Sequence, residues 1–398
     1  MNSQKVSPIM FLLLVFSATG LHSGIRGEAT KLKLPMKSYS YTSVKTPGYV
    51  SDATLHRLDN TPDDNLITDA GATLGRVLFY DKQLSKNNTI SCASCHEQKH
   101  AFSDPRRFST GFNGRPTQRN AMSLVNLRFT NVRGNRPGFF GDERAKTLED
   151  QVLLPIQDNV EMGMKLPQLE AKLDKLSYYF PLFQAAFGSP EVTIDRIAKS
   201  VAQFMRSMVS FNTQFDQAAQ VVGGDYSLNF PDFSAVENLG KSLFIDGLDG
   251  VSEIGCAHCH VPPTFGMPKS FNNGLDLVYR DTGLGARGVP SNDPFTPSND
   301  GKFKASSLRN IMQTAPYMHD GRFKTLDQVI DHYSIGIHPH PNLGVATIDQ
   351  EALKNGRTSG FRYTEKQKAA LIAFLRTLTD ETFVIELRFS DPFVRQDE

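Results

Sequence analysis

Two short segments of the sequence place two cysteines and a histidine in the spacing C-x-x-C-H. The first reads CASCH at residues 92–96 and the second reads CAHCH at residues 256–260. The chain has 398 residues and four cysteines in all, so every cysteine belongs to one of these segments. The residues concerned are Cys92, Cys95, His96, Cys256, Cys259 and His260. A function that uses this motif therefore uses it twice.

Three chemistries use cysteine pairs at this spacing: disulfide or dithiol exchange, a zinc site, and covalent attachment of c-type haem. A zinc ribbon places its two pairs roughly 15 to 20 residues apart, whereas these pairs begin at residues 92 and 256. Neither redox nor zinc chemistry explains why a histidine follows each pair. In haem attachment the thiols bond to the porphyrin and the adjacent imidazole ligates the iron. We therefore predict two covalently bound c-type haems, with structural zinc or disulfides as the alternatives.

The amino terminus has the plan of a secretory signal. Lys5 precedes the apolar run IMFLLLVFSA, and small and polar residues follow. We predict a signal peptide over residues 1–28 and export to the periplasm, since c-type haem is attached outside the cytoplasm in bacteria. The alternative is an uncleaved anchor, although the run is short for a spanning helix. The formal net charge of +1 gives no attraction to nucleic acid, so we expect no nucleic-acid partner.

A longer pattern also occurs twice. LGRVLFYD at residues 74–81 precedes the first motif, and LGKSLFID at residues 239–246 precedes the second. Apolar residues recur at helical spacing in both. This repeat predicts two haem domains related by internal duplication, extending over residues 40–222 and 230–385.

The remaining patterns are helical as well. TIDRIAKSVAQFMRSMVSF is predicted to begin at a Thr193 cap, and TEKQKAALIAFLRTL opens with the capping-box pair Thr364 and Gln367. RAKTLEDQVLLPIQ and TLDQVIDHY are typical of two further amphipathic helices. No comparable run predicts a strand. We therefore predict an all-α fold with two cytochrome c-like haem domains and long loops rich in Gly, Pro and Asn.

Several segments, taken in chain order, resemble the bacterial di-haem cytochrome c peroxidase and MauG family. They are LFYDKQLSKNNTISCASCH, RNAMSLVN, TLEDQVLLPIQDNVEMGM and SLRNIMQTAPYMHDGRFKTLDQVI. The resemblance implies a periplasmic enzyme with two domains. In such an enzyme the N-terminal haem meets hydrogen peroxide and the C-terminal haem handles electrons.

Cleavage of the peroxide bond needs a group that moves a proton from one oxygen to the other, and a carboxylate within hydrogen-bond reach can do this. The resemblance implies that Glu161, in NVEMGM, is this acid/base and that Gln151 is a nearby polar pocket residue. From the residues alone, Glu161 reads more readily as a solvated loop carboxylate. Gln151 reads alternatively as a helix-surface amide.

Many members of this family block the N-terminal iron with a distal histidine until the second haem is reduced, in a loop that reads GH. The matching dipeptide here is Gly111-Phe112. Because a phenyl ring cannot ligate iron, we predict a first iron ligated by His96 alone. His100 is the alternative distal ligand, against a structural or solvent-facing histidine.

The second iron of family members carries a distal methionine or, in MauG-like members, a tyrosine. The matching residue here is Tyr333. A phenolate stabilises ferric iron, whereas a thioether favours ferrous iron, so we predict a low-potential haem ligated by His260 and Tyr333. The alternatives are that Tyr333 is a core aromatic residue and that Met318 is the ligand.

Two more expectations follow from the resemblance. A tryptophan usually separates the haems in a segment like FFWDER, but this chain reads FFGDER with Gly141 in that place and has no tryptophan anywhere. Electrons must then cross in one longer step or through another side chain. The family also holds a calcium ion between its domains, which implies a site formed here by Asn120, Thr314 and Pro316 with water. A plain hydrogen-bonding role for Asn120 is the alternative.

Three functions remain open on this basis. The first is a peroxidase that reduces hydrogen peroxide with electrons from a small cytochrome c or cupredoxin, which we favour. The second is a MauG-like enzyme that oxidises residues of a partner protein. The third is a non-enzymatic di-haem electron carrier, which the loss of tryptophan at Gly141 supports and the retained Glu161 and Gln151 oppose. A homodimer is a further expectation from the resemblance.

Overall fold

The computed structural model describes residues 32–43, 46–130, 138–248, 255–291, 296–344, 355–356 and 358–394. The predicted signal peptide lies outside these ranges. Within them, no helix has the length and apolar character that a bilayer crossing requires.

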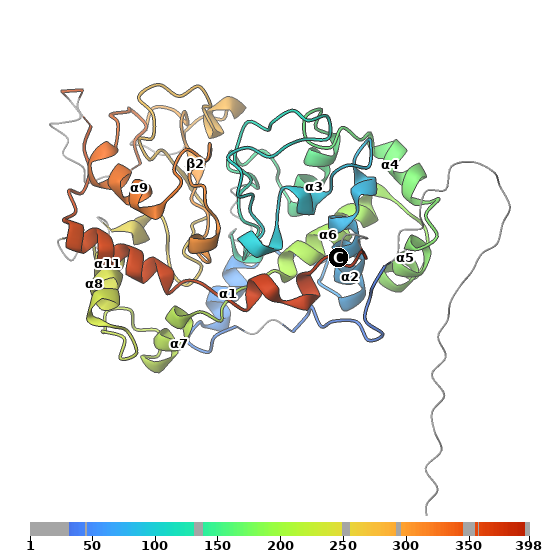
Figure 1. The fold of residues 1–398 in the computed structure, drawn as a ribbon, viewed down its shortest axis with the longest axis horizontal. Coiled ribbons are helices and arrows are strands. Elements are labelled where there is room, and N and C mark those ends of the chain that lie inside the picture. Colours follow the sequence, from blue (N-terminus) through green and yellow to red (C-terminus); the bar gives the residue numbers. More distant parts are fainter. Residues whose placement is uncertain are drawn as a thin grey trace, which may run out of the picture. The chain divides into compact units, whose positions relative to one another are not determined.

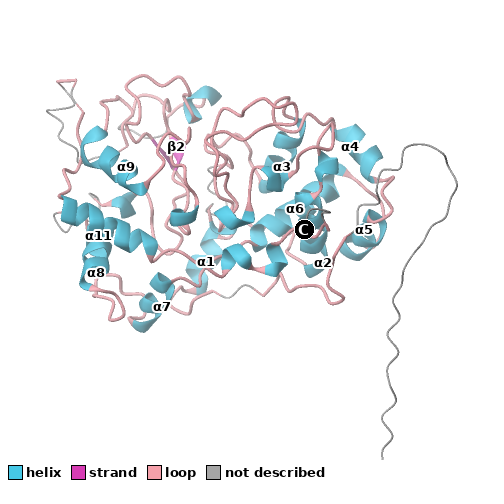
Figure 2. Cartoon of the chain, viewed as in Figure 1, coloured by secondary structure: helices cyan, strands magenta, loops and turns pink. Residues whose placement is uncertain are grey.

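Helices joined by long loops make up most of the described chain (Figure 1, Figure 2). The α-helices are α1 (Asp52–Leu58), α2 (Asp69–Tyr80), α3 (Leu148–Gln157), α4 (Leu166–Leu173), α5 (Tyr179–Phe187), α6 (Ile194–Ser207), α7 (Gln214–Val221), α8 (Ala235–Ile245), α9 (Leu326–Asp331) and α11 (Glu365–Arg376). Two short strands, β1 (Ser270–Phe271) and β2 (Phe303–Lys304), pair antiparallel. This helix-rich architecture with little sheet agrees with the predicted all-α class.

The helices begin where the sequence places capping residues. The Thr193 side chain accepts a hydrogen bond from the Arg196 N–H at the start of α6, and Thr364 forms a capping box with Gln367 at the start of α11. Both predicted caps are confirmed. The helix predicted over TLDQVIDHY ends earlier than expected, because α9 passes into a π-helical turn over His332–Gly336.

Two pairs of helices cross at a glycine. A Cβ placed on Gly75 of α2 would lie 1.9 Å from the Ser200 carbonyl oxygen of α6. A Cβ placed on Gly240 of α8 would lie 1.9 Å from the Ala370 carbonyl oxygen of α11. Only a residue without a side chain allows the two backbones to approach so closely. The two segments that share the LG pattern therefore make the same kind of helix crossing.

This geometry predicts the sign of a stability change. Gly→Ala within a helix ordinarily stabilises by about 1 kcal/mol. At Gly75 we expect the reverse, a loss of about 1 to 3 kcal/mol, because the added methyl group overlaps a backbone carbonyl. Urea unfolding of the haem-loaded protein measures the change. A Gly75→Ala variant more stable than the parent would show that the helices are not in contact here.

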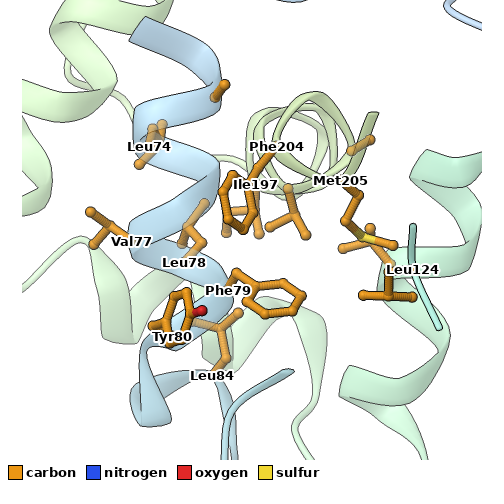
Figure 3. Close-up of a cluster of buried hydrophobic side chains, with 14 of the residues drawn as sticks. Leu74, Val77, Leu78, Phe79, Tyr80, Leu84, Leu124, Ile197, Phe204 and Met205 are labelled. Atoms are coloured by element: carbon orange, nitrogen blue, oxygen red, sulfur yellow. The ribbon is translucent and has the colours of Figure 1, made fainter. Parts of the chain in front are cut away.

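Each helix pair lies at the centre of its own hydrophobic core. Figure 3 shows the first core, in which apolar side chains of α2 face those of α6; the labelled examples include Leu74, Leu78, Phe79, Ile197, Phe204 and Met205. In the segment that joins the two helix pairs, Met208 belongs to the first core and Phe215 belongs to the second. The domain boundary at residues 222–230 stays a prediction. Phe383 and Phe389, near the carboxyl end, return to the first core.

Candidate functional site

The first C-x-x-C-H segment folds as one 3₁₀ turn over Cys92–Ser94. The peptide N–H groups of Cys95 and His96 both donate to the Cys92 carbonyl, at 3.1 and 3.0 Å. The His96 Nδ1 lies 2.9 Å from the Phe102 carbonyl oxygen. Because a carbonyl only accepts hydrogen bonds, Nδ1 carries the proton and Nε2 keeps its lone pair. A haem iron would bind this Nε2.

The second segment repeats this arrangement. It folds as a 3₁₀ turn over Cys256–His258, and the His260 N–H donates to the Cys256 carbonyl at 3.0 Å. The His260 Nδ1 faces two carbonyl oxygens, of Phe265 at 3.2 Å and of Ser306 at 3.1 Å. Burial lowers the pKa of His260, as it does at the first site, so both imidazoles are neutral, the form that binds metal.

The cysteines themselves distinguish haem attachment from the alternatives. Burial raises the pKa of the thiols to about 12 for Cys92 and Cys259 and to about 11 for Cys95 and Cys256. Redox-active C-x-x-C motifs show the opposite shift. No group of three or more His, Cys, Asp and Glu side chains that could hold a metal ion occurs in the described chain. Two thiols and one neutral imidazole at each site fit a covalently attached haem.

Glu161 lies in a tight loop directly after α3. The Asp158 Oδ1 accepts the N–H groups of Val160 at 2.7 Å and Glu161 at 3.0 Å. The Met162 carbonyl accepts the Lys86 N–H at 2.9 Å, which ties the loop to the segment before the first cysteine motif. These bonds fix the Glu161 backbone. Its carboxylate makes no hydrogen bond or ion pair within the described residues, so it is available to a ligand.

The surroundings of Glu161 suit proton transfer. Burial raises the pKa of its carboxyl group to about 6; the negative charge of Asp158 acts in the same direction and Arg144 opposes it. The Glu161 charge in turn contributes to the raised pKa of Cys92 and Cys95. The carboxylate therefore lies near the first haem attachment site. A group that titrates near neutral pH can both accept and return a proton. No sequence pattern points to Asp158 or Arg144, because their effect on Glu161 depends on proximity in space.

Gln151 presents a buried polar atom without a partner. It lies on α3, which Thr147 caps by accepting the Asp150 N–H at 3.0 Å. The Gln151 Oε1 is buried and has no hydrogen-bond partner in the described chain. Such an orphaned group costs about 1 to 3 kcal/mol unless a ligand or water satisfies it. This burial disfavours the helix-surface alternative and fits a residue that lines a ligand pocket.

Phe112 packs against the loop that carries Glu161. Its N–H donates to the Glu161 carbonyl at 2.9 Å. Its ring covers Gly163, where an added Cβ would lie 2.4 Å from the ring. The Phe112 ring thus lies against the loop that carries Glu161 and brings no lone pair. Within the described chain, the alternative ligand His100 makes no side-chain hydrogen bond or ring contact.

At the second site, both ligands left open by the sequence meet at a third residue. The Asn273 Nδ2 donates to the Tyr333 Oη at 3.3 Å and to the Met318 Sδ at 3.5 Å. Burial raises the pKa of Tyr333, and this hydrogen bond opposes the shift. Cys259 also contributes to the raised pKa, so the phenol lies near the second attachment site. Asn273 could not be predicted as a site residue, since an asparagine in a loop belongs to no sequence pattern.

The segment that lacks tryptophan faces an aromatic pair. A Cβ placed on Gly141 would lie 3.7 Å from the Phe303 ring, so a side chain at this position would point at that ring. The Phe303 ring stacks on the His319 imidazole with centroids 3.9 Å apart and planes inclined by 9°. Arg119 lies 5.5 Å from the Phe303 centroid and forms an ion pair with Asp281 at 2.6 Å. The absence of tryptophan is evident from the sequence, whereas these neighbours of Gly141 are not.

Asn120, one of the predicted calcium residues, contacts the segment that follows the other two. The Asn120 Nδ2 donates to backbone carbonyls in residues 104–107 at 2.9 to 3.3 Å, and its N–H donates to the His319 carbonyl at 2.9 Å. The Asn120 Oδ1 and the carbonyls of Thr314 and Pro316 receive no hydrogen bond within the described residues. Oxygen atoms of this kind suit a hard cation. Calcium at this position remains a prediction.

Comparison with known proteins bears on both sites. A sequence profile described as di-haem cytochrome c peroxidase matches residues 69–223. The methylamine utilization protein MauG of Methylorubrum extorquens is 31% identical over 331 residues, covering 82% of this chain and 83% of the relative. Cytochrome c551 peroxidase of Nitrosomonas europaea is 29% identical over 312 residues, covering 78% of this chain and 80% of the relative.

Solved structures agree with these relatives. The crystal structure of a MauG-like protein associated with microbial copper homeostasis superposes with a TM-score of 0.68 at 33% identity, covering 88% of this chain and 99% of that one. The diheme peroxidase BthA from Burkholderia thailandensis superposes with a TM-score of 0.61 at 21% identity, covering 82% and 91% of the two chains, which shows the fold.

Proposed function

We propose that this chain, which belongs to the di-haem cytochrome c peroxidase and MauG family of oxidoreductases, reduces hydrogen peroxide at its N-terminal haem with electrons delivered through its C-terminal haem. The observation that carries this proposal is the Glu161 carboxyl group, whose pKa is raised to about 6 beside the first haem attachment site. The orphaned Gln151 Oε1 on the preceding helix supports it. Steady-state turnover of peroxide with a reduced small cytochrome c or cupredoxin, starting from the oxidised protein, tests it.

Each residue of the first site has a separate role in peroxide reduction. The haem that Cys92, Cys95 and His96 would hold supplies the binding position for peroxide and the first electrons. The Glu161 carboxylate accepts the proton from one peroxide oxygen and returns it to the other, which leaves as water. The Gln151 Oε1 can accept a hydrogen bond from the bound substrate and so orient it. Phe112 leaves the approach free of a competing ligand.

The pKa of Glu161 predicts a pH dependence. Glu161 must start as a carboxylate to accept the first proton, so kcat/KM for peroxide should rise as the pH increases through about 6 and then level off. A Glu161→Gln variant should lose this inflection, since an amide does not titrate. Measurements from about pH 5 to pH 8 cover the range. A flat profile in the parent enzyme would exclude Glu161 as the titrating group.

The second haem is proposed to be held by Cys256, Cys259 and His260, with Tyr333 as the distal ligand. Electron paramagnetic resonance of the oxidised protein should then show a high-spin signal from the first haem and a low-spin signal from the second. Tyr333→Phe should change only the low-spin signal, because the phenyl ring brings no oxygen. Two low-spin signals that both survive this substitution would contradict the assignment.

A second candidate function is oxidation of residues on a partner protein. Tyr333 and the open position at Phe112 favour it, and so does the 33% identity to the MauG-like protein associated with copper homeostasis. Rapid turnover with a reduced cytochrome supports the peroxidase function. Peroxide consumption that is slow with donors but leaves oxidised side chains on a co-purified protein supports the second. A protein that binds both haems and does not react with peroxide would be an electron carrier.

The proposal also covers export, a calcium ion, internal duplication and a homodimer. The enzyme is exported to the periplasm through residues 1–28. A calcium ion held by Asn120, Thr314 and Pro316 stabilises the contact between the two haem domains, and chelation should lower the melting temperature. The domains arose by internal duplication, which the matching glycine crossings of α2 with α6 and of α8 with α11 support. We also propose a homodimer.

A further inference from the structure

We infer that Asn273 is a positioning residue that selects Tyr333 over Met318 as the distal ligand of the second haem iron. The inference rests on the proposed ligation of that haem and adds the group that decides between the two candidate ligands. It concerns which side chain binds the iron in each oxidation state and therefore the reduction potential of the electron-entry haem.

One amide group contacts both candidates. The Asn273 Nδ2 lies 3.3 Å from the Tyr333 Oη and 3.5 Å from the Met318 Sδ, although these partners are 60 and 45 residues away in the sequence. A primary amide has two N–H donors, so a single Asn273 can satisfy both contacts. The phenol oxygen and the thioether sulfur therefore both lie within hydrogen-bond distance of the same amide group.

The backbone of Asn273 is firmly held. His332 Nε2 lies 3.0 Å from the Asn273 carbonyl, which only accepts, so the imidazole donates. The preceding Asn272 is completely buried. Its Oδ1 accepts from the Gly274 N–H at 2.8 Å and from the Tyr279 hydroxyl at 2.9 Å. The backbone from which the Asn273 amide group extends is therefore fixed.

The two candidates differ in how their backbones are placed. Tyr333 lies in the π-helical turn His332–Gly336, and its carbonyl accepts the Phe361 N–H at 3.0 Å. Turns of this type frequently occur at functional sites. Met318 has a φ of 73°, in the left-handed region that a methionine rarely adopts, and its carbonyl accepts the Gly321 N–H at 3.1 Å. Both side chains are thus directed toward Asn273 by specific backbone features.

The two hydrogen bonds have unequal strengths. A bond from a neutral donor to an ionised oxygen is about twice as strong as one between neutral groups, whereas a thioether is a weak acceptor. The amide therefore stabilises the phenolate form of Tyr333, which is the form that binds ferric iron. The weak hydrogen bond to the sulfur gives Met318 no comparable stabilisation. This difference favours tyrosine over methionine.

The removal of this donor should shift the ligand balance. In Asn273→Leu we expect the ratio of tyrosine to methionine ligation to fall roughly ten- to a hundredfold, the factor that a hydrogen bond to a charged group contributes. Because a tenfold change equals 59 mV for a one-electron couple, the reduction potential of the second haem should rise by about 60 to 120 mV. The ferric low-spin signal and the visible spectrum should change to those of a histidine–methionine haem. Asn273→Ala is a second replacement that removes the donor.

Matched variants separate selection from simple loss of structure. Asn273→Gln keeps an amide donor and should retain the parental signal. Asn273→Leu combined with Met318→Leu has no thioether and should lose the methionine signal. The proposal is overturned if Asn273→Leu and Asn273→Ala keep the tyrosine signal at the parental potential or at a lower potential, because the amide would then weaken the bond from the phenolate to iron and would not select it. If instead Tyr333→Phe leaves the second haem unchanged, the ligation itself is wrong and not merely the role of Asn273.

Discussion

Glu161→Gln is expected to lower peroxide turnover by at least about a hundredfold while both haems stay attached. A positioned acid/base contributes about 10² to 10⁴ in rate, or roughly 3 to 5 kcal/mol of barrier. Glutamine keeps the size of the side chain but cannot shuttle a proton. The surrounding loop should be retained, because the Glu161 N–H and carbonyl groups make its hydrogen bonds, to Asp158 and Phe112. Stopped-flow measurement of the first reaction with peroxide locates the loss in the proton-transfer step.

The matched control for this experiment is Glu191→Gln. Glu191 makes an exposed ion pair with Arg196 at 3.6 Å and lies outside both proposed haem sites, so its loss should leave turnover unchanged. Haem content measured by absorbance confirms that both variants are loaded. A Glu161→Gln enzyme that reacts with peroxide at the parental rate would show that Glu161 is not the acid/base. The electron-carrier function would then gain support.

The second large effect concerns activation. The oxidised protein is expected to react with peroxide as isolated, without prior reduction of the second haem, because Phe112 occupies the place of the distal histidine. Phe112→His should introduce a blocking ligand. If that ligand leaves the iron open in about 1% of molecules, the rate falls about a hundredfold in proportion to the open fraction. Reduction of the second haem by one electron should then restore activity.

Phe112→Leu is the control for this substitution. It removes the same ring from Gly163 but brings no ligand, so the oxidised variant should remain reactive. Rapid mixing of each protein with peroxide, before and after partial reduction, gives the comparison. A lag in the parent enzyme that only pre-reduction removes would show that another residue closes the first iron. His100 would then be the next residue to replace.

The contact at Gly141 bears on the expected transfer of electrons between the haems. Gly141 offers no ring, and the space toward which its side chain would point is occupied by Phe303 stacked on His319. Lys304, next to Phe303, donates its N–H to the Gly141 carbonyl at 2.8 Å. The two halves of the chain are therefore in contact here through backbone and aromatic groups. For a chain without tryptophan, the two expectations stay one longer tunnelling step and transfer through another side chain.

Features that depend on a few neighbouring residues could be predicted from the amino-acid sequence. A C-x-x-C-H segment needs only one turn to bring two thiols and an imidazole together, so its chemistry is readable from five residues. Helix starts were also predictable, as at Thr193 and Thr364, because a cap depends on residues within three or four positions. The helical class followed from apolar spacing, which reports one buried face.

Contacts between residues that are far apart in the sequence could be identified only from the tertiary structure. Asn273 meets Met318 and Tyr333 across 45 and 60 residues of chain, and Phe303 fills the side of Gly141 from the opposite half. The carboxyl-terminal Phe389 returns to the first core. The spacing of apolar residues in the sequence indicates the secondary structure of one element and which of its faces is buried. It does not indicate how one long loop packs against another. The groups proposed to tune each haem lie in such loops, so they can be identified only from the folded chain.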